Sequence, residues 1–345
     1  MKQHRMTTPG PLLNERGELA EKGYATGLIK RYDRGAVRAS PLRIKEWDYY
    51  LIASDAYALA LTIADNGYMG LDSVSLIDLG ERWEQTTSRM SLLPLGRRGL
   101  PCTSERGCVR AHGKGYEITF ETSAQSRRLY GHMDNFKDAA PVLFDVTLTD
   151  APRDSMVIAT PFPGAPRAFY YNQKINCLRA EGKMVWNSRE YLFAPAHSFA
   201  VLDWGRGVWT YRNTWYWGSA SGLVNGEPFG FNIGYGFGDT AAATENMLFY
   251  RGEAHKLSHV RFHIPSGGDG REDYLSPWRF DSDDGRFEMN FTPILDRAAC
   301  TDFKLLCSDQ HQVFGRFSGV VRLDDGTPLT VRGLTGFAEK VFNKW

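Results

Sequence analysis

Apolar and polar residues alternate along most of the chain, in short runs that end at turn residues. The run "EWDYYLIAS" is followed by "AYALALTIAD", the turn "NGYMG" and "LDSVSLIDL". Alternation with a period of two residues is typical of strands, and Asn66-Gly67 is a strong hairpin signal. These segments predict a three-stranded antiparallel meander.

Comparable runs recur on both sides of a proline-rich segment, "DAPRDSMVIATPFPGAPRA" at 150–168, which predicts a linker. Helical periodicity is weak throughout, and "LGERWEQTTSRM" at 79–90 is the stretch that most resembles a helix. The chain is therefore predicted to be all-β. We expect an N-terminal β domain with an N-terminal extension over 1–160, and a C-terminal β domain over 161–345.

The two halves of the chain contain similar sequence segments. "WDYYLIASDAYALAL" at 47–61 and "WYWGSASG" at 215–222 each contain an aromatic strand followed by an Ala-Ser step. The offset is about half the chain, which is too long for a solenoid or propeller repeat. This spacing favours two tandem copies of one meandering barrel.

Charge and cysteine content narrow the classes of partner. Lys and Arg number 41 against 40 Asp and Glu, so no global field attracts nucleic acid or an acidic membrane. No apolar run approaches the roughly 18 residues of a membrane span, and the N-terminal segment lacks the apolar core of a secretory signal. The five cysteines are too widely spaced for a zinc knuckle, which favours reduced thiols in a cytoplasmic protein.

The strand "TYRNTWYWGSASG" at 210–222 presents the main candidate binding surface. Its odd-numbered residues should share one face of a strand, and Tyr216 should point the other way. That face is either packed core or the wall of a binding chamber. Asn213 and Ser219 on the same face favour a chamber, because polar groups in a filled core need hydrogen-bond partners.

Three carboxyl groups near this strand are candidate proton donors, since burial among apolar residues raises the pKa of a carboxylic acid. Glu245 is the first candidate and Asp203 the second, with Asp239 the third. The alternatives are an ion pair of Asp203 with Arg206 or Arg212, a turn role for Asp239, and a surface or sheet-pairing role for Glu245.

Several blocks together resemble a bacterial domain-of-unknown-function family, DUF2804, over almost the whole chain. They are "FYYNQKINCLRAEGKMVW", "LDWGRGVWTYRNTWYWGSASG" and "FGFNIGYGFGD". That family is similar in layout to tandem-lipocalin proteins, which include AttH-like proteins, carotenoid hydratases, and fungal hydratases and pericyclases. The resemblance implies two lipocalin-like β-barrel domains with a ligand chamber in one mouth or at their junction.

In the carotenoid hydratases, a set of His, Trp, Tyr and Asp residues is associated with protonation of an alkene. This sequence supplies Trp215 and Trp217 on one strand, with Tyr235 and Asp239 after a turn. Asn213 and Thr214 stand where a histidine would be expected beside the tryptophans. The chain therefore departs from the hydratase pattern at that point.

No cofactor or metal site is predicted. The glycines of "GFNIGYGFGD" do not form a dinucleotide loop, and His255, His259 and His263 on one strand would lie too far apart to share a zinc ion. The first hypothesis is a cofactor-independent hydratase, isomerase or cyclase that protonates an apolar unsaturated molecule. The alternatives are a carrier of a lipid-like ligand and a carbohydrate-active enzyme.

We expect the N-terminal half to serve as supporting structure, and the sequence defines no oligomeric state. The candidate ligand contacts are Tyr211, Arg212, Asn213, Trp215, Trp217, Asn232, Tyr235 and His255.

Overall fold

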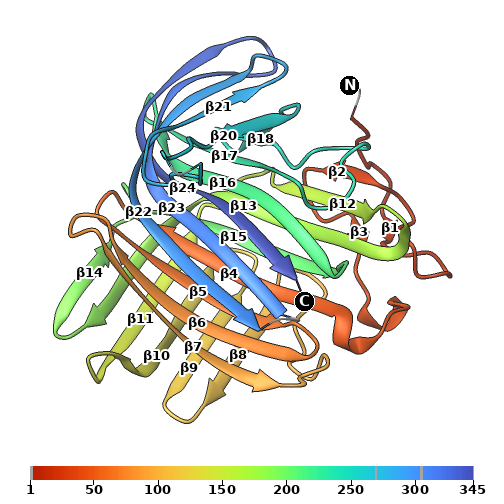
Figure 1. Cartoon of the computed structure of the whole chain (residues 1–345), viewed down its shortest axis with the longest axis horizontal. Helices are drawn as coiled ribbons and strands as arrows, with labels where there is room; N and C mark the ends of the chain where they lie inside the picture. Colours follow the sequence, from red (N-terminus) through yellow and green to blue (C-terminus); the bar gives the residue numbers. More distant parts are fainter. Residues whose placement is uncertain (1–2, 269, 304–305, 345) are drawn as a thin grey trace.

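Two curved antiparallel sheets make up nearly all of the protein (Figure 1). The computed structural model describes residues 3–268, 270–303 and 306–344. Two short 3-10 helices, η1 (Arg34–Ala36) and η2 (Pro41–Arg43), and a small parallel pair, β1 (Gly10–Pro11) and β3 (Lys30–Arg31), precede the main strands. Within the described residues, no helix is long and apolar enough to cross a membrane.

The first sheet has 13 strands, in the order β7-β6-β5-β4-β15-β13-β11-β10-β9-β8, with β12 and β14 on β13 and β2 on β12. Its strands are β2 (Gly23–Ala25), β4 (Ile44–Ala53), β5 (Tyr57–Asp65), β6 (Met69–Asp78), β7 (Trp83–Leu92), β8 (Gly107–Gly113), β9 (Tyr116–Thr122), β10 (Arg127–Lys137), β11 (Ala140–Thr149), β12 (Met156–Phe162), β13 (Ala165–Trp186), β14 (Arg189–Phe193) and β15 (Phe199–Val208).

The second sheet has 9 strands, in the order β19-β18-β17-β16-β24-β23-β22-β21-β20. Its strands are β16 (Arg212–Val224), β17 (Glu227–Tyr235), β18 (Met247–Tyr250), β19 (Glu253–Lys256), β20 (Val260–His263), β21 (Trp278–Ser282), β22 (Phe287–Phe303), β23 (Leu306–Arg322) and β24 (Pro328–Lys344).

Both sheets follow the same plan. Each starts with a four-stranded meander whose first strand also pairs with the last strand of its sheet: β4 pairs with β5 and β15, and β16 pairs with β17 and β24. The repeated aromatic segments begin on β4 and β16, the equivalent strands of the two sheets, but the Ala53-Ser54 step lies at the end of β4 and Ala220-Ser221 lies within β16. The all-β prediction and the two tandem lipocalin-like halves are confirmed.

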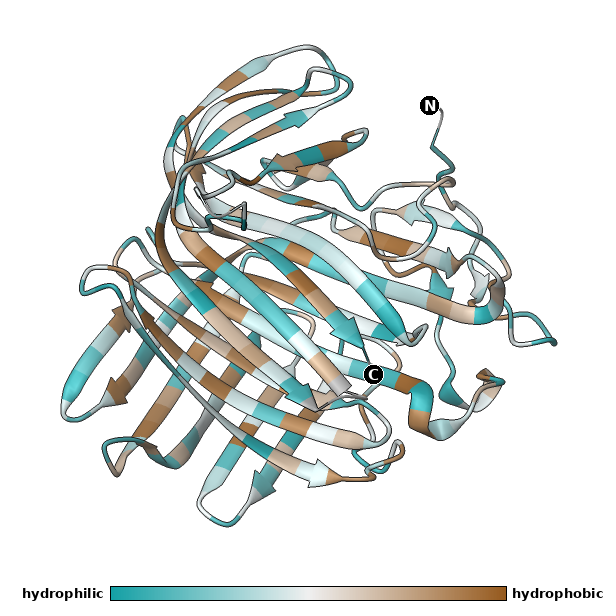
Figure 2. Cartoon of the chain, viewed as in Figure 1, coloured by the Kyte–Doolittle hydropathy of each residue, from teal (hydrophilic) through white to brown (hydrophobic). Residues whose placement is uncertain are grey.

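Alternation along the strands divides the protein into three layers of apolar residues, and Figure 2 shows the alternating hydropathy along most strands. Tyr50 of β4 packs inside the first half, and Ala220 of β16 packs inside the second. The opposite faces of the two sheets pack against each other in a third cluster, which includes Trp217 and Phe337. Burying a side chain such as Phe337, which is 0% exposed, contributes about 2 kcal/mol, so this layer holds the halves together.

Three local expectations differ from the structure. The segment expected as a linker forms β12 and the start of β13, because its Pro163-Gly164 dipeptide makes the hairpin turn between these strands. The boundary expected at 160/161 consequently falls within the first sheet, and the chain passes to the second sheet only between β15 and β16. The helix-like stretch at 79–90 contributes to the edge strand β7, where the β-branched Thr86 and Thr87 favour extended backbone.

Candidate functional site

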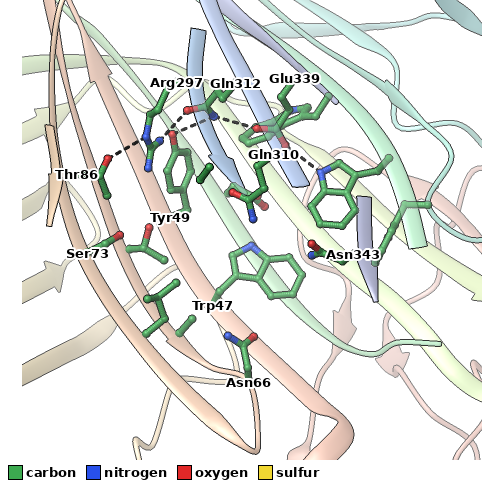
Figure 3. Close-up of a pocket in the computed structure, with 18 of the residues that line it drawn as sticks. Trp47, Tyr49, Asn66, Ser73, Thr86, Arg297, Gln310, Gln312, Glu339 and Asn343 are labelled. Atoms are coloured by element: carbon green, nitrogen blue, oxygen red, sulfur yellow. Dashed lines mark hydrogen bonds between the residues drawn. The ribbon is translucent and has the colours of Figure 1, made fainter. Parts of the chain in front are cut away.

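A cavity of about 390 Å³ lies between the two sheets, with walls from both halves of the protein (Figure 3). β4 to β7, β13 and β15 of the first sheet contribute side chains, as do β16 and β22 to β24 of the second. The lining includes Trp47 and Tyr49, so the N-terminal half forms part of the site. The expectation that this half is only supporting structure is therefore wrong.

Five aromatic side chains form one part of the lining, called here the aromatic wall: Trp47, Tyr170, Trp209, Trp215 and Phe237. Their rings meet mainly edge to face, with centroids 5.3 Å apart for Trp47 and Trp209 and 4.8 Å for Trp209 and Phe237. This geometry is favourable for aromatic pairs. Phe237 reaches the wall because Gly236 and Gly238, at φ 92° and 76°, turn the chain sharply on either side of it.

Lys174 is a buried cation in the cavity lining. It lies opposite Asp203 in the pairing of β13 and β15, and its Nζ is 3.1 Å from Asp203 Oδ2. The same Nζ lies 3.6 Å from the ring centroid of Trp217, within cation–π range. Asp203 Oδ1 also accepts a 2.6 Å hydrogen bond from Asn172 Nδ2. Asp203 is therefore paired with Lys174, and not with Arg206 or Arg212.

Glu339 of β24 is a second charged residue of the lining that the sequence reasoning missed. Its Oε1 accepts a 2.9 Å hydrogen bond from Trp215 Nε1, and its Oε2 accepts one of 3.0 Å from Gln312 Nε2. Burial raises the pKa of Glu339 to about 7, although the Trp215 hydrogen bond and the charge of Lys174 act in the opposite direction. Glu339 can therefore exchange a proton near neutral pH.

Glu245, the first candidate from the sequence, also lines the cavity. Burial raises the pKa of its carboxyl, opposed by the charge of Lys174 and a 3.3 Å hydrogen bond from Asn232 Nδ2. Asn232 Oδ1 in turn accepts a 2.7 Å hydrogen bond from Trp217 Nε1. Asn232 thus lies behind the lining and positions two of its members. The described residues contain no group of three or more His, Cys, Asp or Glu that could hold a metal ion.

Trp215, Trp217, Asp203 and Glu245 are thus brought together around one cavity, but other predicted site residues lie elsewhere. Asp239 is exposed, and its Oδ1 accepts a hydrogen bond from the backbone of Ala241 in a turn. Tyr235 stacks on Tyr216, 4.4 Å between centroids, against the core of the second half. His255 accepts a hydrogen bond from the Asp324 backbone outside the cavity.

The start of the aromatic strand also lies outside the cavity lining. Tyr211 is 48% exposed, and Arg212 is exposed at the first position of β16. Asn213 makes two hydrogen bonds to Thr210, which fix the turn before the strand. The odd-numbered face of β16 therefore contacts the cavity only at Trp215 and Trp217, and Tyr216 points to the opposite side as predicted. Ser219 lies outside the lining and accepts a 2.9 Å hydrogen bond from Asn176.

The sequence carries a signal for one of the two missed residues. Lys174 lies within a nearly continuous buried run of β13, and Glu339 has the same parity as the buried Phe337 and Val341. A charged side chain in phase with buried apolar neighbours on a strand must find partners or a cavity. A search for such residues would have found Glu339. Lys174 has Asn172 and Asn176 as its neighbours on the same face, so its burial follows only from the packing of the sheets.

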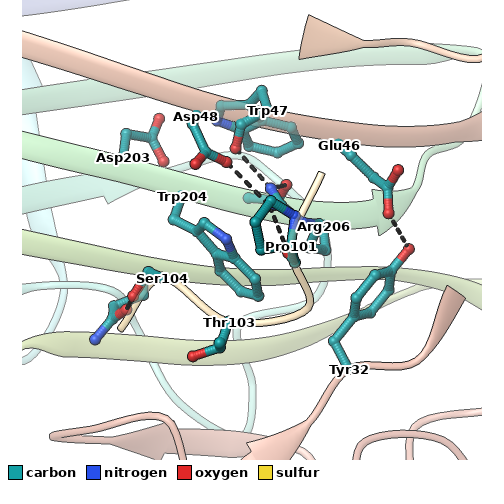
Figure 4. A network of polar contacts seen from close by, with 12 residues as sticks. Tyr32, Glu46, Trp47, Asp48, Pro101, Thr103, Ser104, Asp203, Trp204 and Arg206 are labelled. Atoms are coloured by element: carbon teal, nitrogen blue, oxygen red, sulfur yellow. Dashed lines mark hydrogen bonds and ion pairs between the residues drawn. The ribbon is translucent and has the colours of Figure 1, made fainter. Parts of the chain in front are cut away.

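A separate polar network lies on the other face of β4 (Figure 4). Arg206, which is 0% exposed, donates hydrogen bonds to Asp48 Oδ1 at 3.0 Å, to the Pro101 carbonyl at 2.8 Å and to the Trp47 carbonyl at 2.8 Å. Burial raises the pKa of Asp48, and the Arg206 charge opposes this. The network contributes no side chain to the cavity, but it fixes the backbone that carries Trp47.

Three solved structures share this fold at low sequence identity. An AttH-like protein from Nitrosomonas europaea has a TM-score of 0.53 and 15% identity, over 88% of this chain and 93% of that chain. Kievitone hydratase from Nectria haematococca has a TM-score of 0.51 and 12% identity, over 97% and 98%. CghA, solved with Sch210972, has a TM-score of 0.50 and 10% identity, over 96% and 97%. At these identities the comparisons establish the fold alone.

No curated protein matches the chain significantly. The model of a family described as a domain of unknown function, DUF2804, matches residues 3–345. This match covers almost all of the sequence, including every strand that lines the cavity. The chain therefore belongs to the DUF2804 family.

Proposed function

We propose that this protein is a cofactor-independent enzyme that protonates an apolar, unsaturated small molecule in the cavity between its two halves. The observation that carries the proposal is Glu339, a carboxylic acid with a pKa raised to about 7 on a cavity that also has an aromatic wall. A carrier of apolar ligands has no need of buried carboxyl groups facing its cavity, because each one is costly to desolvate.

Glu339 is the proton donor in this proposal. The sequence favours Glu245, but the hydrogen bonds from Trp215 and Gln312 hold both oxygens of Glu339 in place and stabilise the carboxylate that remains after proton transfer. Asp203 is committed to the ion pair with Lys174. Glu245 is another carboxyl group of the cavity lining and can accept a proton.

The reaction starts when the Glu339 proton adds to one carbon of a carbon–carbon double bond, which leaves a positive charge on the other carbon. The faces of the aromatic wall stabilise this cation. Capture by water, followed by loss of the extra proton to a carboxylate such as Glu245, gives a hydrated product. Capture by a second double bond forms a ring and moves the cation, which then loses a proton to the same carboxylate. Direct loss of a neighbouring proton to the carboxylate gives an isomer. One structural relative is a kievitone hydratase, and this supports the hydratase type.

The test measures the incorporation of deuterium from solvent into carbon–hydrogen positions of the product. The protein is incubated in D₂O with kievitone, and separately with a total small-molecule extract of bacterial cells, and the compounds are returned to H₂O and analysed by mass spectrometry. A proton donated by Glu339 would be a deuteron, so the product would retain deuterium on carbon. We expect Glu339→Gln to reduce this labelling by about 100-fold or more.

Glu288→Gln is the matched control, because Glu288 is exposed on β22 and contributes nothing to the cavity lining. It should label as well as the wild type. Undiminished labelling by Glu339→Gln would reject Glu339 as the donor. If no compound acquires deuterium and an unlabelled molecule is recovered from the purified protein, the carrier hypothesis is favoured over the enzyme.

A further inference from the structure

Polar side chains from both halves line the cavity away from the aromatic wall. Thr86 of β7 and Ser73 of β6 come from the first sheet, and Arg297 of β22 comes from the second. Figure 3 shows Arg297 and Thr86 together on one side, separate from Trp47. A fully apolar ligand would displace water from the polar atoms of these groups that have no hydrogen-bond partner, which is unfavourable.

Arg297 has hydrogen-bonding capacity to spare. Its Nε donates to Thr86 Oγ1 at 3.1 Å and its Nη1 donates to Gln312 Oε1 at 2.8 Å, so two of the five N–H donors of a guanidinium are used. No carboxylate of a described residue lies within 4.0 Å of its nitrogens. The two neutral partners orient the guanidinium without forming a direct ion pair. Such an oriented guanidinium can bind an oxygen anion.

The neighbouring charges limit what that anion can be. Glu84 also lines the cavity, and its Oε2 accepts a 3.1 Å hydrogen bond from Thr86, the residue that Arg297 contacts. A doubly charged group such as a phosphate would be repelled by Glu84. A singly charged oxygen acid matches the single charge of Arg297 better.

The strand register of the second sheet sets the distance between Arg297 and Glu339, the proposed proton donor. Arg297 is paired with Gln312, and Gln312 with Glu339, on three adjacent strands. Two strand spacings amount to about 10 Å between backbones. The anionic group and the protonated carbon of one ligand would therefore be separated by several bonds.

We propose that the cavity binds an amphipathic molecule whose single anionic oxygen acid contacts Arg297 while its unsaturated part packs against the aromatic wall. This inference rests on the proposed function for the identity of the reactive end. It adds the class of substrate, an unsaturated or aromatic monoanion in place of a neutral hydrocarbon.

The test measures binding and needs no turnover. 1-Pyrenebutyrate and the uncharged 1-pyrenebutanol are titrated into the protein, and energy transfer from tryptophan to pyrene reports occupancy. We expect the carboxylate to bind about 10-fold or more tightly than the alcohol, and Arg297→Met to weaken pyrenebutyrate binding by about 10- to 100-fold. Binding of pyrenebutanol should change less than about twofold, since the alcohol makes no charge-assisted contact.

Two further variants keep the result interpretable. Arg297→Lys retains the charge and should retain part of the preference, even if Arg297→Met folds poorly. Arg332→Met is the matched control, because Arg332 is exposed on β24 and outside the cavity lining, and it should bind both probes as the wild type does.

Equal affinity of the wild type for the two probes, binding of neither probe, or equal loss of both in Arg297→Met would overturn the proposal. Glu339→Gln should keep the preference for pyrenebutyrate while losing deuterium transfer. Failure of the proton-donor hypothesis is thereby distinguished from failure of the anion hypothesis.

Discussion

The indole nitrogen of Trp215 donates a 2.9 Å hydrogen bond to Oε1 of Glu339, from one strand of the second sheet to its neighbour. Trp215 belongs to the aromatic wall, and Glu339 is the proposed proton donor. One residue therefore supplies both an apolar surface for the ligand and a neutral hydrogen-bond donor to the acid. The donor favours the ionised carboxylate and counteracts the effect of burial on the pKa.

Trp215→Phe tests this balance, because it keeps an aromatic ring and removes the N–H group. We expect the pKa of Glu339 to rise by about 0.5 to 1, which corresponds to the loss of one hydrogen bond of about 1 kcal/mol. The measurement is a pH titration of carboxyl ¹³C signals, with Glu339→Gln to assign the resonance. Trp217→Phe, whose N–H contacts Asn232, is the control. An unchanged Glu339 titration in Trp215→Phe would contradict the proposed hydrogen-bond effect.

The Lys174–Asp203 pair should be important for stability, since both side chains are largely buried. Lys174→Met leaves Asp203 charged and unpaired, and we expect a loss of about 3–5 kcal/mol in the free energy of unfolding. Lys174→Met combined with Asp203→Asn should recover most of that loss. Urea denaturation of the single and double variants measures both effects.

The same strand offers a matched comparison. Lys183, also on β13, pairs with Glu190, but both side chains are about half exposed. Lys183→Met should cost less than about 1 kcal/mol, as is typical of surface ion pairs. Equal costs at the two positions would argue that Lys174 is solvated and not buried.

Glu339 should also give the protein a pH-dependent stability. Its pKa is raised from 4.5 to about 7 on folding, so between these values the folded state binds more protons than the unfolded state. The stability contributed by this group therefore falls as the pH rises from 4.5 to about 7 and is constant above that. The linkage amounts to about 3 kcal/mol.

The measurement is the free energy of unfolding at pH 5 and pH 8. The wild type should lose stability over this interval by about 2–3 kcal/mol more than Glu339→Gln does. Glu288→Gln, at an exposed position, should keep the wild-type difference. The same pH dependence in wild type and Glu339→Gln would mean that Glu339 titrates at its ordinary pKa.

Much of the fold could be predicted from the sequence because alternation and hairpin turns are local signals. The meander of β4, β5 and β6 with its Asn66-Gly67 turn follows the prediction. The prolines of 150–168 misled the prediction because their role depends on position: at a hairpin turn or a strand end, they are compatible with a sheet.

The site could be predicted only in part. Trp215 and Trp217 were found because their shared face follows from parity within one strand. The contact of Glu339 with Gln312, by contrast, depends on the register of β23 and β24, and the approach of Trp47 depends on how the two sheets pack. Neither is encoded in the spacing of a single strand.

Gly234 offers a test of where Glu245 lies. A Cβ at this position would be 2.6 Å from Glu245 Oε1 and 2.8 Å from the Tyr216 carbonyl oxygen, which is closer than real Cβ contacts come. Gly234→Ala should therefore displace the Glu245 carboxyl from the cavity and lower the free energy of unfolding by about 1–3 kcal/mol. Gly27→Ala, where a Cβ meets nothing within 4 Å, should change stability by about 0.5 kcal/mol or less. Urea denaturation of both variants decides the question, and a Gly234→Ala protein as stable as Gly27→Ala would show that the Glu245 carboxyl does not occupy this position.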